Sequence, residues 1–163
     1  MWRALTAAGS ADGLVPAGLA ARDTLRLEAG MPLYGNELTA QVTPFEAGLG
    51  RVVAFGKPGD FVGRAALAER AETGPAQVLA GLTVGSRRVP RHGYPVLWDG
   101  RPGGTVTSGA PSPTLGVPIA MAYLDPDVAR KADADAGVRL AVDIRGTAEP
   151  AQLVSLPFYR RPR

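Results

Sequence analysis

Charged side chains gather in one short stretch of the chain, residues 21–38, with the sequence ARDTLRLEAGMPLYGNEL. Glu28 would lie in the last turn of a helix there, where its carboxylate could accept two parallel N–H donors from a heterocycle such as an aminopyrimidine. The same residues also fit a surface helix in which Asp23 and Arg26, three positions apart, form an ion pair. Spacing alone does not choose between a ligand-binding carboxylate and a surface ion pair.

Two other polar segments offer weaker signals for chemistry. Residues 107–116, TSGAPSPTLG, combine glycine, proline, serine and threonine, which predicts a well-determined loop. A phosphate-binding loop is the alternative, but neither a GxGxxG pattern nor a Walker-type lysine is present. His92 is a lone histidine in a predicted turn, and without a GxSxG motif the sequence does not indicate nucleophilic catalysis by serine.

The composition narrows the possible chemistry. The 163-residue chain has no cysteine and one histidine. These counts exclude a disulfide framework and a thiolate nucleophile and disfavour a histidine-rich metal site, so we expect metal-free chemistry. No run of about 18 apolar residues is present, and the N-terminus lacks the charged start, apolar core and cleavage site of a signal peptide. We therefore expect a soluble, cytoplasmic protein.

Basic residues are concentrated in the second part of the chain. Residues 1–74 contain seven Lys/Arg and eight Asp/Glu, whereas residues 75–163 contain eleven and seven. Arg87, Arg88 and Arg91 form one group, and the terminal YRRPR forms another. A solvated basic surface accounts for this pattern. Nucleic-acid binding has little support, because no aromatic residues that could stack on bases are interleaved with the arginines.

Several helices and one strand must position the polar residues of the first part. Helical spacing predicts a helix over residues 21–29, with Gly30 and Pro32 as its stop signal. The segment WRALTAAG predicts a short helix that ends near Gly9, and RVVAF, residues 51–55, predicts a strand.

A longer amphipathic helix is predicted in the segment DFVGRAALAERAETG. Asp60 has the residue type of an N-cap, and Gly74 that of a helix stop. The spacing of Phe61, Ala65 and Ala68 predicts that these three side chains face the core.

After residue 74 the pattern changes to short segments of alternating apolar and polar residues. The residues predicted to share one face of a strand are Val78, Ala80, Leu82 and Val84; Ile119, Met121 and Tyr123; and Val138, Leu140, Val142 and Ile144. Asp99-Gly100 favours a type I′ hairpin turn. Short strands with turn signals about every ten residues indicate a small antiparallel barrel or sandwich, with a domain boundary between residues 74 and 77.

Four stretches taken in order resemble the T-protein of the glycine cleavage system, the tetrahydrofolate-dependent aminomethyltransferase. They are GLVPAGLAARDTLRLEAGMPLYGNEL; TPFEAGLGRVVAF with DFVGRAAL; RHGYPVLWDG with GTVTSGAPSPTLG and IAMAYL; and LPFYRR. The resemblance covers essentially the whole chain but only the later part of that family's sequence. It implies an α+β segment followed by an all-β small antiparallel barrel. Residues 1–75 would then end the α+β folate-binding region, and residues 76–163 would form the C-terminal barrel domain.

The resemblance also implies a reaction and a binding site. In this family a tetrahydrofolate nitrogen takes the aminomethyl carbon from the lipoyl arm of the H-protein, which yields methylene-tetrahydrofolate and ammonia. The glutamate of RLEAG, here Glu28, would bind the pterin ring. Lys57 matches a second basic contact by spacing, and Tyr159 and Arg160 match the closing segment near the folate tail. Arg51 stands where many members have tryptophan.

One family element has no counterpart in this sequence. The catalytic aspartate of the family belongs to an earlier segment, and Asp12 and Asp60 do not match it. We therefore expect residues 1–163 alone to be inactive, to bind folate weakly or not at all, and to need the missing N-terminal T-protein region as a partner. Apolar surface exposed without that region would favour self-association.

Two other functions remain open at this point. The chain could be the T-protein-like folate-binding tail of a protein of the sarcosine or dimethylglycine dehydrogenase type. It could also be a folate-binding module without catalysis.

Overall fold

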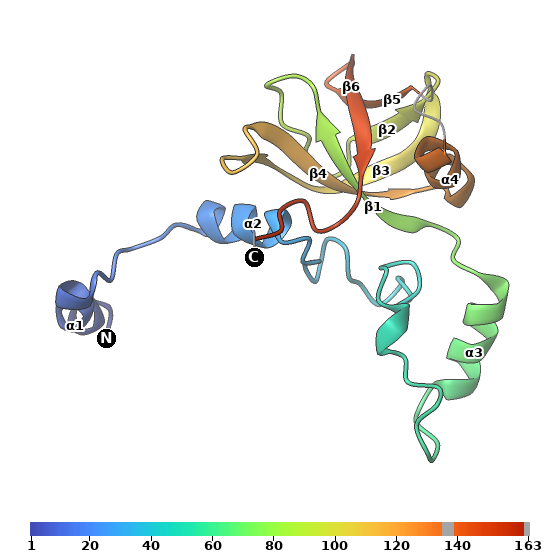
Figure 1. Ribbon diagram of the computed structural model, residues 1–163, viewed down its shortest axis with the longest axis horizontal. Coiled ribbons are helices and arrows are strands. Elements are labelled where there is room, and N and C mark those ends of the chain that lie inside the picture. Colours follow the sequence, from blue (N-terminus) through green and yellow to red (C-terminus); the bar gives the residue numbers. More distant parts are fainter. Residues whose placement is uncertain (135–138, 162–163) are drawn as a thin grey trace.

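A six-stranded antiparallel barrel forms the larger part of the computed structural model, which describes residues 1–134 and 139–161 (Figure 1). The strand order around the closed barrel is β1-β4-β3-β2-β5-β6. The strands are β1 (Val78–Val84), β2 (Pro95–Trp98), β3 (Arg101–Ser112), β4 (Val117–Leu124), β5 (Leu140–Ile144) and β6 (Thr147–Val154). The helices are α1 (Trp2–Gly9), α2 (Leu19–Glu28), α3 (Arg64–Thr73) and α4 (Pro126–Ala134), with two 3-10 turns, η1 (Ser10–Asp12) and η2 (Gly50–Val52). A helical segment followed by a closed antiparallel barrel confirms the predicted fold class.

Period-two alternation explains how the barrel interior is filled. In β1, Ala80, Leu82 and Val84 are buried in one core cluster, with Val78 packed against its edge. In β5, Leu140, Val142 and Ile144 join the same cluster. Alternate side chains of a strand point to one face, so both predicted faces are confirmed for the described residues. Val138 lies outside the described residues.

The predicted hairpin at Asp99-Gly100 is also confirmed. These two residues connect β2 to β3, and their φ angles are 46° and 77°. A type I′ turn requires positive φ at both central positions, which Asp and Gly tolerate. Trp98 pairs with Arg101 directly across the turn, so this dipeptide sets the register of the hairpin.

Strand β4 is covered on both faces, which differs from the half-buried strand that its alternation predicted. Ala120, Ala122 and Leu124 face the barrel core. Ile119 and Met121 point the other way and form a second cluster with Leu27 of α2, Ala110 of β3 and the C-terminal residues Leu156 and Phe158. Helix α2 therefore packs on the outside of the barrel across β3 and β4.

Two predictions for the first part of the chain were wrong. Residues 51–55 do not form a strand: η2 occupies Gly50–Val52 and turns follow it. Helix α3 begins at Arg64 rather than next to Asp60, whose carboxylate accepts the N–H of Phe61 instead. No residue of α3 is buried, because its apolar residues are mostly alanines spread around the helix, so the predicted core-facing set does not form.

The predicted loop over residues 107–116 was wrong in its first half. Residues 107–112 continue β3, and only residues 113–116 form the turn to β4. Gly109 and Pro111 of this segment are accommodated in the strand, which has a register shift between Val106 and Ser108. The polar residues of the segment thereby gain fixed positions on the barrel wall.

Helices in the described part of the chain are all too short or too polar to cross a membrane. The first barrel strand begins at Val78, while the division of the chain at residue 75 remains a prediction. Helix α1 stands away from the barrel on an extended connection and has no buried residue (Figure 1).

Candidate functional site

The C-terminal end of α2 is the centre of the candidate site. Ala29 ends the helix and Gly30 follows with φ = 68°. The N–H of Gly30 donates to the carbonyl of Leu27 (2.8 Å), and that of Met31 to the carbonyl of Arg26 (2.8 Å). This left-handed glycine cap reverses the chain directly after Glu28. A Cβ on Gly30 would also lie 3.0 Å from the Cα of Pro157, so the turn fits closely against the C-terminal segment.

Glu28 is a buried carboxylate whose acceptor positions are largely occupied. Its exposed fraction is 4%. Oε1 accepts the hydroxyl of Ser112 and the N–H of Thr114 (3.2 Å), and Oε2 accepts the hydroxyl of Thr114 (2.8 Å). A carboxylate has about four lone-pair positions, so these three bonds leave one, on Oε2. Glu28 thus ties α2 to the turn between β3 and β4, and Thr114, which is exposed, lies over Oε2.

The environment of Glu28 keeps its carboxylate ionised. Desolvation by burial raises the pKa of Glu28, but the hydrogen bonds from Ser112 and Thr114 together lower it by more, so the pKa lies below its ordinary value of 4.5. The folded state therefore holds the charged form more strongly than the unfolded chain does. An anionic acceptor at neutral pH is what an N–H donor of a ligand would need.

The lowered pKa of Glu28 predicts how the free energy of unfolding depends on pH. The contribution of Glu28 is present above pH 4.5 and is lost as the pH falls through its folded-state pKa. We expect Glu28→Gln to reduce the free energy of unfolding at pH 7 by about 1–2 kcal/mol, with the gap between the two proteins shrinking as the pH falls below 4.5. Urea denaturation at several pH values measures this. Glu69→Gln, an exposed control on α3, should leave the profile unchanged, and a gap that stays constant at low pH would contradict the assignment.

Arg26 is the second buried charge at this end of α2. Its guanidinium donates to Oε2 of Glu37 (3.0 Å), to the hydroxyl of Ser108 (2.8 Å) and to Oδ1 of Asp23 (2.7 Å). The predicted pair with Asp23 is therefore present. The surface setting was wrong, however, because Arg26 is 9% exposed and its main partner, Glu37, is fully buried.

The loop after α2 is held by the same group of residues. Oε2 of Glu37 also accepts the N–H of Leu33 (2.8 Å), and Nδ2 of Asn36 donates to the hydroxyl of Ser108 (2.9 Å). The hydroxyl of Tyr123 donates to the carbonyl of Glu37 (2.7 Å). We call Arg26, Glu37, Ser108 and Asn36 the Arg26 cluster. It joins α2, the loop of residues 31–38 and β3 next to Glu28.

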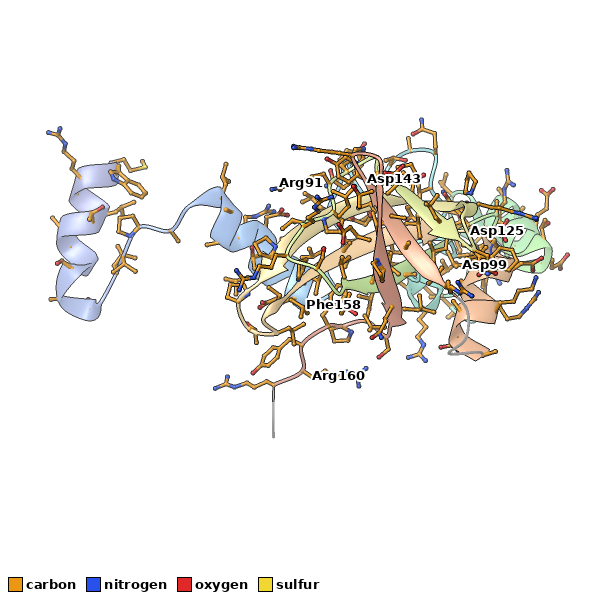
Figure 2. All side chains as sticks on the ribbon, turned by 90° about the horizontal axis from the view of Figure 1, so that it is seen from above. Arg91, Asp99, Asp125, Asp143, Phe158 and Arg160 are labelled. Carbon is orange, nitrogen blue, oxygen red and sulfur yellow. The ribbon has the colours of Figure 1, made fainter. Side chains whose placement is uncertain are left out.

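One of the two predicted residues of the C-terminal segment, Tyr159, contacts Glu28. The N–H of Tyr159 donates to the carbonyl of Glu28 (2.9 Å), and the side chain of Tyr159 is 41% exposed. Arg160 follows and extends into solvent on the outer side of the molecule (Figure 2). The structure thus joins the backbones of Glu28 and Tyr159, and Arg160 follows directly in the chain.

Lys57 is not part of this group. It is exposed in the loop that follows η2 and leads towards α3, away from α2 (Figure 1). Arg51 is also exposed, in η2 itself. Tetrahydrofolate binding by Lys57 remains a prediction, as it does for Glu28, Tyr159 and Arg160.

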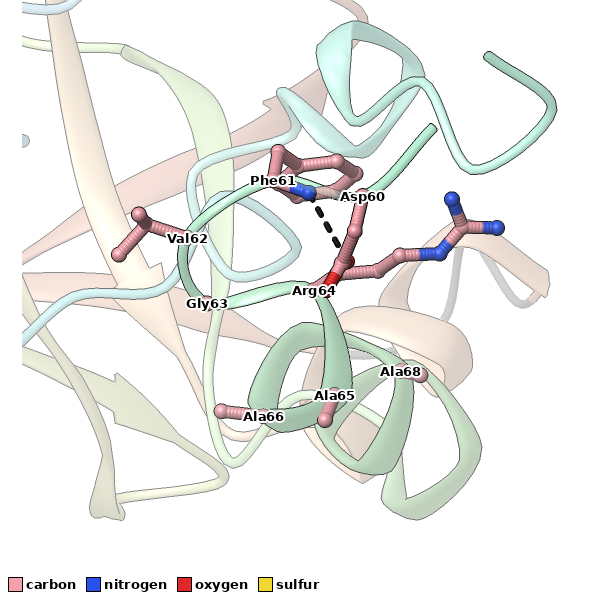
Figure 3. A pocket seen from close by; sticks show the side chains of 8 residues that line it. All are labelled: Asp60, Phe61, Val62, Gly63, Arg64, Ala65, Ala66 and Ala68. Carbon is pink, nitrogen blue, oxygen red and sulfur yellow. Dashed lines mark hydrogen bonds between the residues drawn. The ribbon is translucent and has the colours of Figure 1, made fainter. Parts of the chain in front are cut away.

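A large hollow in the first part of the chain lacks the features of a reactive site. It has a volume of about 850 Å³ and surrounds the start of α3 (Figure 3). Three of its eight lining residues are alanines, and the guanidinium carbon of Arg64 lies 5.8 Å from the ring centre of Phe61. Asp60 points at its own neighbour, the N–H of Phe61, so no polar groups converge there on a shared point.

Sequence reasoning predicted Asp23 as a partner of Arg26 but missed the partners that Arg26 and Glu28 have on the barrel. Ser108, Ser112 and Thr114 all come from the segment TSGAPSPTLG, for which the sequence predicts a loop that satisfies its own backbone. The sequence feature that could have indicated these partners is the number of hydroxyl groups in this segment. It is informative only once it is known that α2, which carries Glu28, packs on β3.

Comparisons with known proteins show which family this chain resembles. A family model described as the glycine cleavage T-protein C-terminal barrel domain matches residues 77–160, and one described as the GCVT N-terminal domain matches residues 1–57. The chain is 64% identical to an aminomethyltransferase of Streptomyces coelicolor over 99% of its own length and 43% of that protein. It is 62% identical to an aminomethyltransferase of Saccharopolyspora erythraea, again over 99% and 43%.

A solved structure is also similar. The crystal structure of the glycine cleavage system aminomethyltransferase T from Bartonella henselae aligns with a TM-score of 0.78 at 34% identity, covering 88% of this chain and 39% of that one. The chain thus spans about two fifths of the length of the relatives it matches.

Proposed function

This chain belongs to the glycine cleavage T-protein family, and we propose that it supplies the barrel and the adjoining folate-binding elements of a tetrahydrofolate-dependent aminomethyltransferase. The observation that carries the proposal is the 64% identity to a protein named aminomethyltransferase, which extends over 99% of the chain. In the proposed reaction the aminomethyl carbon passes from the sulfur of a lipoylated H-protein to tetrahydrofolate, ammonia leaves, and the lipoyl arm is released as a thiol. Tetrahydrofolate would supply the nitrogen nucleophile.

The acceptor groups at the end of α2 fit a pterin in a specific way. Glu28 is held ionised, and its one remaining acceptor position is on Oε2 beneath exposed Thr114. We propose that this position takes a single N–H donor of the pterin. A contact through both oxygens would require release of Ser112 or Thr114. The backbone of Tyr159 is hydrogen-bonded to that of Glu28, and Arg160, the next residue, offers a cation for the carboxylates of the folate tail.

The outer face of α2 supports a role for further protein in completing the site. Leu19, Leu25 and Met31 are more than half exposed, and they line a hollow of about 640 Å³ along the helix. Exposed apolar surface of this kind is typical of a surface that another segment covers. We propose that the N-terminal region of a T-protein, to which the catalytic aspartate belongs, covers this face and completes the folate site.

A chimeric enzyme tests the proposed function. In the Streptomyces coelicolor aminomethyltransferase, the matching 43% of the chain would be replaced by residues 1–163. Methylene-tetrahydrofolate formation would then be followed with aminomethyl-loaded H-protein. We expect activity within about tenfold of the parent enzyme, and in the Glu28→Ala chimera a KM for tetrahydrofolate raised at least about tenfold, because a charged acceptor is lost.

Two controls make the result interpretable. Glu69→Ala removes an exposed carboxylate on α3 and should leave KM unchanged. Circular dichroism and size-exclusion chromatography establish that each chimera is folded. A folded chimera without activity would contradict the proposed function, whereas an active chimera in which Glu28→Ala leaves KM unchanged would contradict only the role of Glu28.

A further inference from the structure

Three arginines from two separate segments surround a hollow at one end of the barrel. The hollow has a volume of about 470 Å³ and lies between the loop after β1 and the turn that joins β5 to β6. Arg88 and Arg91 come from the loop, and Arg145 comes from the turn, more than fifty positions later in the chain. Tyr94 and Ile144 form its apolar wall. We call this the arginine pocket.

The fold fixes both segments that carry the arginines. The loop is hydrogen-bonded to β3 through the N–H of Gly93, which donates to the carbonyl of Val106 (2.8 Å), and through His92 Nδ1, which lies 2.9 Å from the carbonyl oxygen of Thr107. Arg145 occupies a left-handed position, with φ = 57°, which is unfavourable for a residue with a side chain.

The turn that bears Arg145 is stabilised by a side chain at its start. Asp143 Oδ1 accepts the N–H of Gly146 (2.7 Å), which closes the turn between β5 and β6. The positions of the three arginines therefore follow from the barrel and do not depend on a long flexible loop.

The charges in the pocket are only partly balanced. Arg88 forms an ion pair with Glu149 at 3.3 Å, in which Glu149 is 13% exposed and Arg88 is 56% exposed. Arg91 and Arg145 are exposed, and neither has an ion-pair partner within residues 1–134 and 139–161. Counting Asp143 and Glu149 against the three arginines leaves an excess of one positive charge, and Arg87 beside the pocket adds another.

We propose that the arginine pocket binds an acidic peptide segment of a partner protein through at least two carboxylates. Guanidinium groups present paired N–H donors that match carboxylates. Arg88 already binds one carboxylate, that of Glu149. The hollow is far larger than one ion needs, and its wall of Tyr94 and Ile144 suits the methylene groups of acidic side chains. Arg91, which lines the pocket, and Arg160 lie at opposite edges of the molecule in Figure 2, so the proposal does not depend on folate binding.

Fluorescence anisotropy with a labelled glutamate-rich hexapeptide tests this proposal on the chain of residues 1–163. We expect saturable binding at low salt that weakens as salt is added. Arg91→Gln with Arg145→Gln should weaken binding at least about tenfold, because both unpaired cations are lost. Glu149→Gln should tighten binding by about threefold, because it frees Arg88 from its competing carboxylate.

A second double variant with the same change in net charge distinguishes a specific site from non-specific electrostatic attraction. Arg70→Gln with Arg101→Gln removes two exposed cations elsewhere on the molecule and should change the affinity less than about twofold. Equal weakening by both double variants, or no saturable binding at low salt, would overturn the proposal. Citrate is a competitor in the same assay. If citrate displaces the peptide and binds as tightly as the peptide does, the proposal is also overturned, and the occupant is a small polycarboxylate.

Discussion

Replacement of Arg26 by methionine is expected to lower the free energy of unfolding by about 3–5 kcal/mol. Arg26 is the cation that faces fully buried Glu37, at 3.0 Å. Methionine leaves that carboxylate without its ion pair, and Oε1 of Glu37 already has no hydrogen-bond partner among the residues that the structure describes. An uncompensated buried charge is among the most destabilising changes in a protein. Guanidinium denaturation followed by circular dichroism measures the loss.

Two variants distinguish this explanation from a general effect on α2. Arg22→Met changes an exposed arginine one turn earlier on the same helix and should alter stability by less than about 0.5 kcal/mol. Adding Glu37→Gln to Arg26→Met removes the buried charge and should recover part of the lost stability. If the double variant is less stable than Arg26→Met by the full cost of the second change, the two residues are not coupled as the structure indicates.

Gly109→Ala is expected to cost about 3 kcal/mol, because β3 passes directly beneath the loop after β1. A Cβ at this position would overlap the carbonyl oxygen of Pro90 and lie 3.0 Å from its carbonyl carbon. These are backbone atoms of a buried residue, so the strain cannot be relieved by rotation of a side chain. Thermal denaturation should show a clearly lowered Tm.

A matched glycine substitution is available at the start of the same loop. At Gly85 the nearest atom to an added Cβ is the carbonyl oxygen of Pro150 at 3.9 Å, an ordinary contact. Gly85→Ala should therefore change stability by less than about 1 kcal/mol. Similar losses in the two variants would show that the close approach of Pro90 to β3 is not what excludes a side chain at residue 109.

The segment TSGAPSPTLG shows why these effects are large. Ser108 is hydrogen-bonded to Arg26, and Ser112 and Thr114 are hydrogen-bonded to Glu28. Gly109 has no side chain and so leaves room for the backbone of Pro90. Four positions of one strand and turn thus connect the barrel to both buried charges of α2 and to the loop that carries the arginine pocket. A segment that we predicted to be a self-contained loop is the main contact between the two parts of the chain.

Local patterns in the sequence were sufficient for the elements whose stability is local. Alternation located β1 and β5, Asp99-Gly100 located the hairpin, and Gly30 marked the end of α2, because side-chain period and positive φ depend on a few neighbouring residues. The same reasoning failed for residues 51–55, where apolar residues had no neighbouring strand with which to pair.

The sequence by itself determined that Glu28 ends a helix and that a barrel follows, and its resemblance to the T-protein indicated what that carboxylate could bind. Only the tertiary structure decided that Ser112 and Thr114, 84 and 86 residues away, fill three of its acceptor positions, and that Arg26 is buried against Glu37. Arg145 likewise meets Arg88 and Arg91 only through closure of the barrel. The physical reason is that hydrogen-bond satisfaction of a buried charge depends on which surfaces pack together, and no local pattern encodes that.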